Sequence, residues 1–272
     1  MTPPAISVNS LEKSFPPTRS GWRTFLQPFE KPTVIALAGV SLEVFEGEAV
    51  ALLGANGAGK STLLKILATL LLPTRGSATV SGHDTLTDSR TVRRQIGYHA
   101  GTEHGFYPRL SGRENLLFFG RLNMLSSASA AKRIAALADR FHLAEALDRQ
   151  VRTLSTGTVQ RLSLARSLLH QPRVLLLDEP TRSLDAIAAA QFRGFLKSEV
   201  LRPGATSLLF SSHTLAEIEQ LASRIAVIDS GRLLAFDTLA GLKQITGAAT
   251  LEDVFLKLTG QSHDITPEEA VQ

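Results

Sequence analysis

Gly54-Ala55-Asn56-Gly57-Ala58-Gly59-Lys60-Ser61 is the stretch that decides the fold, because it fits the pattern G-x-x-x-x-G-K-S/T at every position, with Thr62 next in the chain. An apolar run precedes the stretch at residues 49–53, and a helical pattern follows at residues 60–72. Glycines let backbone N–H groups surround phosphate oxygens, and the following helix points the positive end of its dipole at them. Lys60 is expected to reach the β- and γ-phosphates, and the Ser61 hydroxyl to ligate Mg²⁺. The stretch therefore predicts a nucleotide phosphate site on a strand–loop–helix unit.

A second apolar run ends in two acids, in the order Val174-Leu175-Leu176-Leu177-Asp178-Glu179-Pro180. Two carboxylates at the end of a buried strand are costly unless they serve a cation or a water molecule. We expect Asp178 to hold the Mg²⁺ shell and Glu179 to polarise the attacking water as a general base. Following a phosphate loop, this pair predicts hydrolysis of a nucleoside triphosphate.

Composition bounds the class of protein. The chain has 272 residues, of which 43% are hydrophobic, enough for a sizeable core. It has no apolar run of about 18 residues and no leader at its start, so we expect neither a membrane span nor a secretory signal. Without cysteine there is no disulfide, thiolate zinc site or cysteine nucleophile, which suits a reducing, cytoplasmic compartment. The net charge of +4 is too diffuse to indicate nucleic acid, and no nucleic-acid partner is expected.

Strand and helix patterns alternate along the chain and predict an α/β fold with a mixed sheet. The predicted strands cover residues 6–15, 36–45, 49–53, 96–99, 174–177, 207–211, 225–229 and 233–236. The predicted helices cover residues 60–72, 111–124, 128–139, 157–170, 184–200, 214–222 and 251–258. Residues 98–155 are almost wholly helical in pattern and predict an inserted helical subdomain. Residues 1–260 then form one domain, and residues 261–272 form a polar tail.

Further motifs carry a family resemblance. Leu154-Ser155-Thr156-Gly157-Thr158, followed by Val159-Gln160-Arg161 and the Asp178-Glu179 strand, resembles the signature motif of ABC-transporter ATPases. Ser183-Leu184-Asp185 resembles the family's D-loop, and Ser211-Ser212-His213 ends a strand where the family has its switch histidine. Leu251-Glu252-Asp253-Val254-Phe255 resembles a C-terminal helix of type-2 exporters. The sequence thus resembles an ABC cassette over residues 6–260.

The resemblance implies a P-loop fold with a RecA-like mixed-sheet core, an antiparallel β subdomain and an inserted helical subdomain. It also implies that two cassettes form a homodimer head to tail around two ATP molecules, with Ser155 and Gly157 of one chain facing Lys60 and Ser61 of the other. His213 would contact the γ-phosphate and link it to Glu179 and the opposing Asp185. A separate integral-membrane permease is the implied partner, which places the chain peripherally on the cytoplasmic face of the inner membrane.

Two segments depart from the family pattern. The family's loop glutamine is missing: spacing puts Gly101 at that position, and Glu103 is the nearest side chain that could replace it, or is simply solvated. In the signature, Thr156 and Thr158 stand where glycine and glutamine are usual, whereas Ser155 and Gly157 remain. The resemblance therefore implies an active, slow ATPase.

The connection at residues 16–33 is longer than a tight turn requires, which leaves two features open. Adenine is expected to stack on Phe15, or else on Trp22 or Phe25. Trp22, Phe25 and Leu26 share one face of a short helix predicted over residues 19–27, which suits a membrane interface or a permease. Packing of this helix on the chain's own first sheet is the alternative.

Three functions are compatible with this resemblance. The first is the ATPase of a two-component exporter. The second is a soluble ABC ATPase of DNA repair or translation, although the coiled coil, zinc modules or second cassette typical of those proteins are missing from the sequence. The third is a nucleotide-responsive regulator without turnover, which the missing loop glutamine favours and the set of Lys60, Asp178, Glu179 and His213 opposes.

Overall fold

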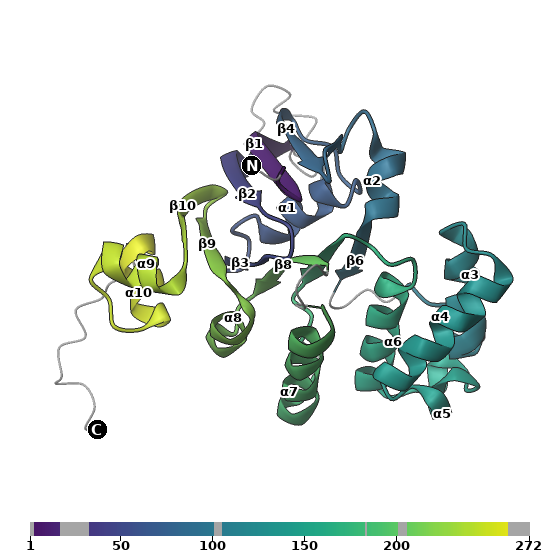
Figure 1. Cartoon of the computed structure of the whole chain (residues 1–272). Helices are drawn as coiled ribbons and strands as arrows, with labels where there is room; N and C mark the ends of the chain where they lie inside the picture. Colours follow the sequence, from purple (N-terminus) through teal and green to yellow (C-terminus); the bar gives the residue numbers. More distant parts are fainter. Residues whose placement is uncertain (1–2, 17–32, 101–104, 183, 201–205, 261–272) are drawn as a thin grey trace, which may run out of the picture.

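A six-stranded sheet forms the centre of the computed structural model, which describes residues 3–16, 33–100, 105–182, 184–200 and 206–260 (Figure 1). Its strand order is β10-β9-β3-β8-β7-β6. All neighbours pair in parallel except β10 with β9. The strands are β3 (Ala49–Leu53), β6 (Ile96–Ala100), β7 (Val174–Asp178), β8 (Ser207–Ser212), β9 (Arg224–Asp229) and β10 (Arg232–Asp237). The carboxyl ends of β3, β7 and β8 therefore meet at one edge, which is where ligands bind in open α/β sheets.

A second sheet is antiparallel, with the order β2-β1-β4-β5. Its strands are β1 (Ile6–Phe15), β2 (Val34–Val44), β4 (Arg75–Val80) and β5 (His83–Asp84). Helix α1 (Lys60–Leu67) lies between the two sheets (Figure 1). Alternate residues of β3 point to opposite faces: Val50 and Leu52 join the core beneath this antiparallel sheet, whereas Ala51 and Leu53 join the core on the other face.

Helices cover that other face of the six-stranded sheet. They are α6 (Thr156–Leu168), α7 (Ala186–Phe195) with a π-helical continuation (Leu196–Val200), α8 (Leu215–Leu221) and α10 (Leu251–Thr259). Each helix contributes apolar side chains to the core around Phe210 of β8, which is fully buried. Both faces of the sheet are covered, which agrees with the continuous apolar runs that the sequence shows at residues 49–53 in β3 and 174–177 in β7.

The inserted helices form a group at one side of the sheet (Figure 1). They are α3 (Gly112–Leu122), α4 (Ser127–Arg140) and α5 (Ala144–Leu147), followed by a 3₁₀ turn (Val151–Thr153). Ser111 and Glu114 form the capping box that begins α3, as predicted. The lower limit predicted for the helical segment, about residue 98, falls inside β6, so the helices begin later than the sequence suggested.

The predicted α/β class with a mixed sheet is confirmed, with local corrections. Helix α1 ends at Leu67 instead of residue 72, and Thr69 just beyond it has a left-handed backbone, φ +59°. The strands β4 and β5 and the helices α2 (Ser89–Gln95) and α9 (Leu239–Thr246) were not predicted. None of the helices in the described ranges has the length and apolar character needed to span a membrane.

Candidate nucleotide-binding and catalytic site

The phosphate loop joins β3 to α1, and two of its glycines are required by close backbone contacts. Gly59 has φ +106°, and a Cβ built on it would lie 2.4 Å from the carbonyl oxygen of Ala36 in β2. A Cβ on Gly54 would lie 2.2 Å from the carbonyl oxygen of Ile228 in β9. The loop is thus packed against both sheets, and any side chain at either position would force it to move.

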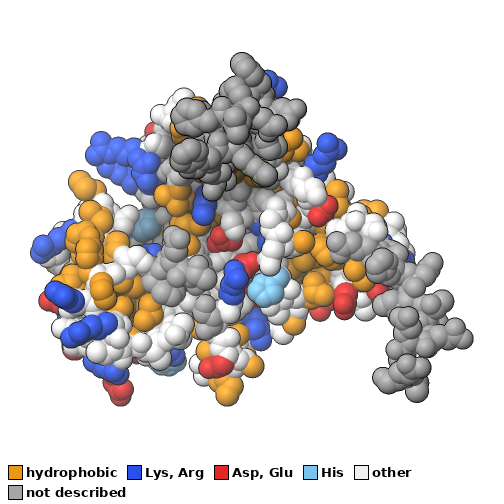
Figure 2. Space-filling view, turned by 180° about the vertical axis from the view of Figure 1, so that it is seen from behind, with side chains coloured by type: hydrophobic (Ala, Val, Ile, Leu, Met, Phe, Trp, Pro, Cys, Tyr) orange, Lys and Arg blue, Asp and Glu red, His pale blue; other side chains and the backbone are white. Residues whose placement is uncertain are grey.

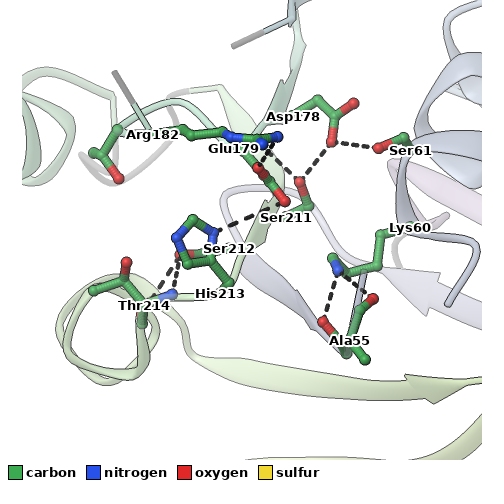
Figure 3. Close-up of polar contacts among 12 residues, drawn as sticks. Ala55, Lys60, Ser61, Asp178, Glu179, Arg182, Ser211, Ser212, His213 and Thr214 are labelled. Carbon is green, nitrogen blue, oxygen red and sulfur yellow. Dashed lines mark hydrogen bonds and ion pairs between the residues drawn. The ribbon is translucent and has the colours of Figure 1, made fainter. Parts of the chain in front are cut away.

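Lys60 is the first residue of α1, and its side chain turns back over the loop (Figure 3). Its Nζ donates to the carbonyl oxygens of Gly54 (2.6 Å) and Ala55 (2.9 Å). Burial lowers the pKa of Lys60, and the negative charges of Glu179 and Asp178 oppose that shift. A phosphate oxygen would give this buried ammonium an anionic partner in place of neutral carbonyls.

Asp178 and Ser61 come together although they are far apart in the sequence. The Ser61 hydroxyl donates to Asp178 Oδ1 (2.9 Å), and the Ser211 hydroxyl donates to the same oxygen (2.7 Å; Figure 3). This oxygen-rich pair fits Mg²⁺, which usually takes one or two protein ligands and completes its shell with phosphates and water. No group of three His, Cys, Asp or Glu side chains in the described part of the chain could hold a metal by itself.

Glu179 follows Asp178 in a strained conformation, with φ +46°. Its backbone N–H is held by Ser211, through the side-chain oxygen (2.9 Å) and the carbonyl oxygen (3.2 Å). Its mostly buried carboxylate pairs with Arg182 (Nη1–Oε2, 3.1 Å) and lies 3.8 Å from Nδ1 of His213 (Figure 3). The ends of β7 and β8 thus bring the predicted base and the predicted switch histidine together.

A cavity of about 490 Å³ lies above the phosphate loop, and we call it the phosphate-loop cavity. Its lining includes most of the predicted residues: Asn56, Gly57, Gly59, Lys60, Ser61, Thr62, Asp178 and Glu179. Gly54, Ala55 and Ala58 belong to the loop but do not line the cavity. Phe15 does not line it either; it ends β1, where Lys13 Nζ lies 5.0 Å from its ring centre.

A second cavity, of about 800 Å³, is lined by Ser155, Gly157 and Asp185, and we call it the signature cavity. Ser155 caps α6 by accepting a hydrogen bond from the Thr158 N–H (3.3 Å), and Asp185 caps α7 by accepting one from the Ala188 N–H (2.8 Å). The two cavities share no lining residue. Within one chain, the structure therefore assembles each half of the predicted site, but the two halves line separate cavities.

Sequence reasoning missed two residues of the site. Arg182 lines the phosphate-loop cavity and pairs with Glu179, and Ser211 joins Asp178 to Glu179. Arg182 stands three residues after Glu179, a spacing that could have suggested the pair. Other predictions lie outside the described residues: Gly101 and Glu103, the helix at 19–27 with Trp22, Phe25 and Leu26, and Ser183.

The phosphate loop follows β3, and the acid pair lies at the end of β7, which is separated from β3 in the sheet by β8. This arrangement defines a P-loop nucleoside triphosphatase. Comparison with known proteins narrows this class. The family described as "ABC transporter" matches residues 37–182. The chain is 37% identical over 227 residues to the ABC transporter ATP-binding protein NatA of Bacillus subtilis, covering 84% of this chain and 92% of NatA. It is 42% identical over 226 residues to the daunorubicin resistance ATP-binding protein DrrA3 of Streptomyces coeruleorubidus, covering 83% and 70%.

Solved structures agree with these sequence matches. The structure of an ATP binding subunit of an ABC transporter has a TM-score of 0.79 at 27% identity, covering 94% of this chain and 99% of that one. The dimeric structure of MJ0796, a bacterial ABC transporter cassette, has a TM-score of 0.73 at 25% identity, covering 86% and 98%. The chain belongs to the ABC transporter family and is an ATP-binding and ATP-hydrolysing cassette, as the resemblance implied.

Proposed function

We propose that the chain energises an exporter by hydrolysing ATP as a homodimer on a separate integral-membrane permease. One observation carries the proposal: the phosphate-loop cavity and the signature cavity are separate cavities that share no lining residue. A complete site then needs two chains, so that the signature cavity of one covers the phosphate-loop cavity of the other. A symmetric pair of this kind forms two equal sites.

Each half supplies a different part of the reaction. Lys60 and the loop N–H groups bind the β- and γ-phosphates, while Ser61 and Asp178 would hold Mg²⁺, which would supply charge neutralisation at the phosphates. Glu179 accepts a proton from the attacking water, and His213 lies beside its carboxylate to contact the γ-phosphate. From the partner, the Ser155 hydroxyl, the Gly157 N–H and the positive end of α6 bind the γ-phosphate. Asp185 lies in the same cavity and would approach the partner's His213.

The helical group is the surface we assign to the permease. Figure 2 shows hydrophobic side chains gathered over this group. Large apolar residues here are each at least 36% exposed: Tyr107, Phe118, Leu122 and Met124. Contact with the cytosolic end of a permease would bury this surface and hold the cassette peripherally at the cytoplasmic face of the inner membrane. The name of DrrA3, a daunorubicin resistance protein, supports export as the direction of transport.

Glu179→Gln tests this proposal. The variant keeps the shape of the side chain but cannot accept a proton, so we expect it to bind ATP, hydrolyse little and accumulate as a dimer. Light scattering with and without Mg-ATP measures the dimer, and a phosphate-release assay measures turnover. Glu219→Gln, on the exposed side of α8, is the matched control. Unchanged turnover in Glu179→Gln would remove the role assigned to Glu179.

A further inference from the structure

Glu217 is a buried acid that the proposed mechanism leaves without a task. It lies in α8 and is 0% exposed. No basic side chain in the described part of the chain forms an ion pair with it, and its Oε1 is buried without a hydrogen-bond partner there. Burying a carboxyl group in this way is costly, so a packing role alone would be served better by an apolar residue.

The other oxygen of Glu217 joins two segments of the catalytic machinery. Oε2 accepts hydrogen bonds from the hydroxyl of Ser212 (2.6 Å) and from the hydroxyl of Thr181 (3.1 Å). Ser212 directly precedes His213, and Thr181 is two residues after Glu179. One buried oxygen of Glu217 therefore joins Thr181, which follows the general base, to Ser212, which precedes the histidine.

We propose that Glu217 is a positioning residue for ATP hydrolysis, which sets the distance between Glu179 and His213 by holding Thr181 and Ser212 on one oxygen. This inference rests on the roles proposed above for Glu179 and His213. Those two side chains lie on loop segments after β7 and β8, and His213 itself is exposed. Ser211 already holds the Glu179 N–H at the start of the two segments, and Glu217 adds a second link further along, between Thr181 and Ser212. Without this second link, we expect the 3.8 Å separation of Glu179 Oε1 and His213 Nδ1 to widen.

The hydrogen bonds define what the residue must provide. Both hydroxyls donate to the same oxygen, so a single good acceptor at that point is enough. Burial raises the pKa of Glu217, against the opposing effects of the Ser212 and Thr181 hydrogen bonds and of the charges on Arg193 and His213. Charged or neutral, the carboxyl group presents an acceptor oxygen to the two donors, and glutamine presents the carbonyl oxygen of its amide in the same place. Methionine has about the same length and fills the space without an acceptor.

The test therefore compares Glu217→Gln with Glu217→Met in the full chain, measuring kcat and KM for Mg-ATP and the affinity for ATP. We expect Glu217→Gln to stay within about two-fold of the parent kcat, because the acceptor is kept. We expect Glu217→Met to lose about ten- to a hundred-fold in kcat with KM and ATP affinity unchanged, because displacing a catalytic group costs rate and not binding. Glu219→Met on the exposed side of the same helix is the control.

A second comparison separates positioning from loss of structure. If Glu217 acts through His213, Glu217→Met should lower kcat much less in a His213→Ala background than in the parent. Equal losses in both backgrounds, or a parent-like kcat in Glu217→Met, would overturn the inference. If His213→Ala alone kept full turnover, the role proposed for His213 would fail, and that outcome is distinct from the failure of Glu217.

Discussion

The phosphate-loop cavity and the signature cavity differ in chemistry although they belong to one chain. The first is lined by a buried ammonium and two carboxylates, and hydrogen bonds run from Ser61 through Asp178 and Ser211 to Glu179. The second is lined by two helix N-termini with their caps, Ser155 and Asp185, and by aromatic rings, including Phe141 and Phe195 at 4.1 Å between ring centres.

This difference separates two tasks. The phosphate-loop side holds the groups proposed to move a proton and to bind a cation, and such groups are effective when their own chain preorganises them. The signature side offers hydroxyl and N–H donors, which we propose act only on a phosphate brought by another chain. On the proposed mechanism, a cassette with one copy of each side binds ATP alone but needs a second cassette to hydrolyse it.

The largest effect is expected on the phosphate-loop side. Lys60→Ala removes the buried cation that meets the β- and γ-phosphates, so ATP turnover should fall by about 10²- to 10³-fold. ATP affinity should fall as well, because the lost contact is made in the ground state too. A titration with a fluorescent ATP analogue measures the affinity, and phosphate release measures the turnover.

Lys132→Ala in α4 is the matched control for Lys60→Ala, because it removes the same group from an exposed position. It should leave both quantities at the level of the parent chain. Turnover by Lys60→Ala at the rate of this control would show that the loop lysine has no part in the reaction.

A smaller and different effect is expected on the signature side. Ser155→Ala should lower turnover by about 10- to 10²-fold, because it removes one donor to the γ-phosphate. It should leave ATP binding by the single chain unchanged, since Ser155 does not line the phosphate-loop cavity.

The loss of a helix cap must be separated from this effect, because Ser155 also caps α6. Ser126→Ala removes an equivalent cap from the start of α4, where Ser126 accepts from the Ser129 N–H (3.2 Å) and lines neither cavity. If the two variants lost turnover equally, or if Ser155→Ala weakened ATP binding by the single chain, the division of tasks would be wrong.

The two sides also differ in how far the sequence predicted them. The phosphate-loop motif and the acid pair are each a continuous stretch of sequence, so residue type and spacing were enough to predict them. The contacts of Ser211 were not predicted because they depend on how β8 lies beside β7. The pairing of Arg182 was not predicted because it depends on the turn after Glu179. The short, half-exposed strand β4 (Arg75–Val80) has too little apolar periodicity to be predicted without its partner β1.

The smallest effect is expected on the pH dependence of stability, and it comes from the buried Glu217 beside the phosphate-loop side. The pKa of Glu217 is raised above its ordinary value of 4.5, so the folded chain holds this proton to higher pH than the unfolded chain does. Stability is therefore lost as pH rises from about 4.5 towards the folded pKa, at about 1.4 kcal/mol for each pH unit by which the pKa is raised. Glu217→Gln has no such proton, so its free energy of unfolding should rise relative to that of the parent chain over this pH range. Urea unfolding at a series of pH values measures the difference. A constant difference from pH 4.5 upward would contradict the shift.

The claim that one site needs two chains is tested most directly by mixing Lys60→Ala with Ser155→Ala. Each homodimer carries a defect in both sites, whereas a mixed dimer has one site with the intact Lys60 of one chain and the intact Ser155 of the other. If dimers form at random in an equal mixture, half are mixed, and turnover should recover to about a quarter of the parent value. A mixture that turns over ATP no faster than the mean of the two variants alone would contradict the account.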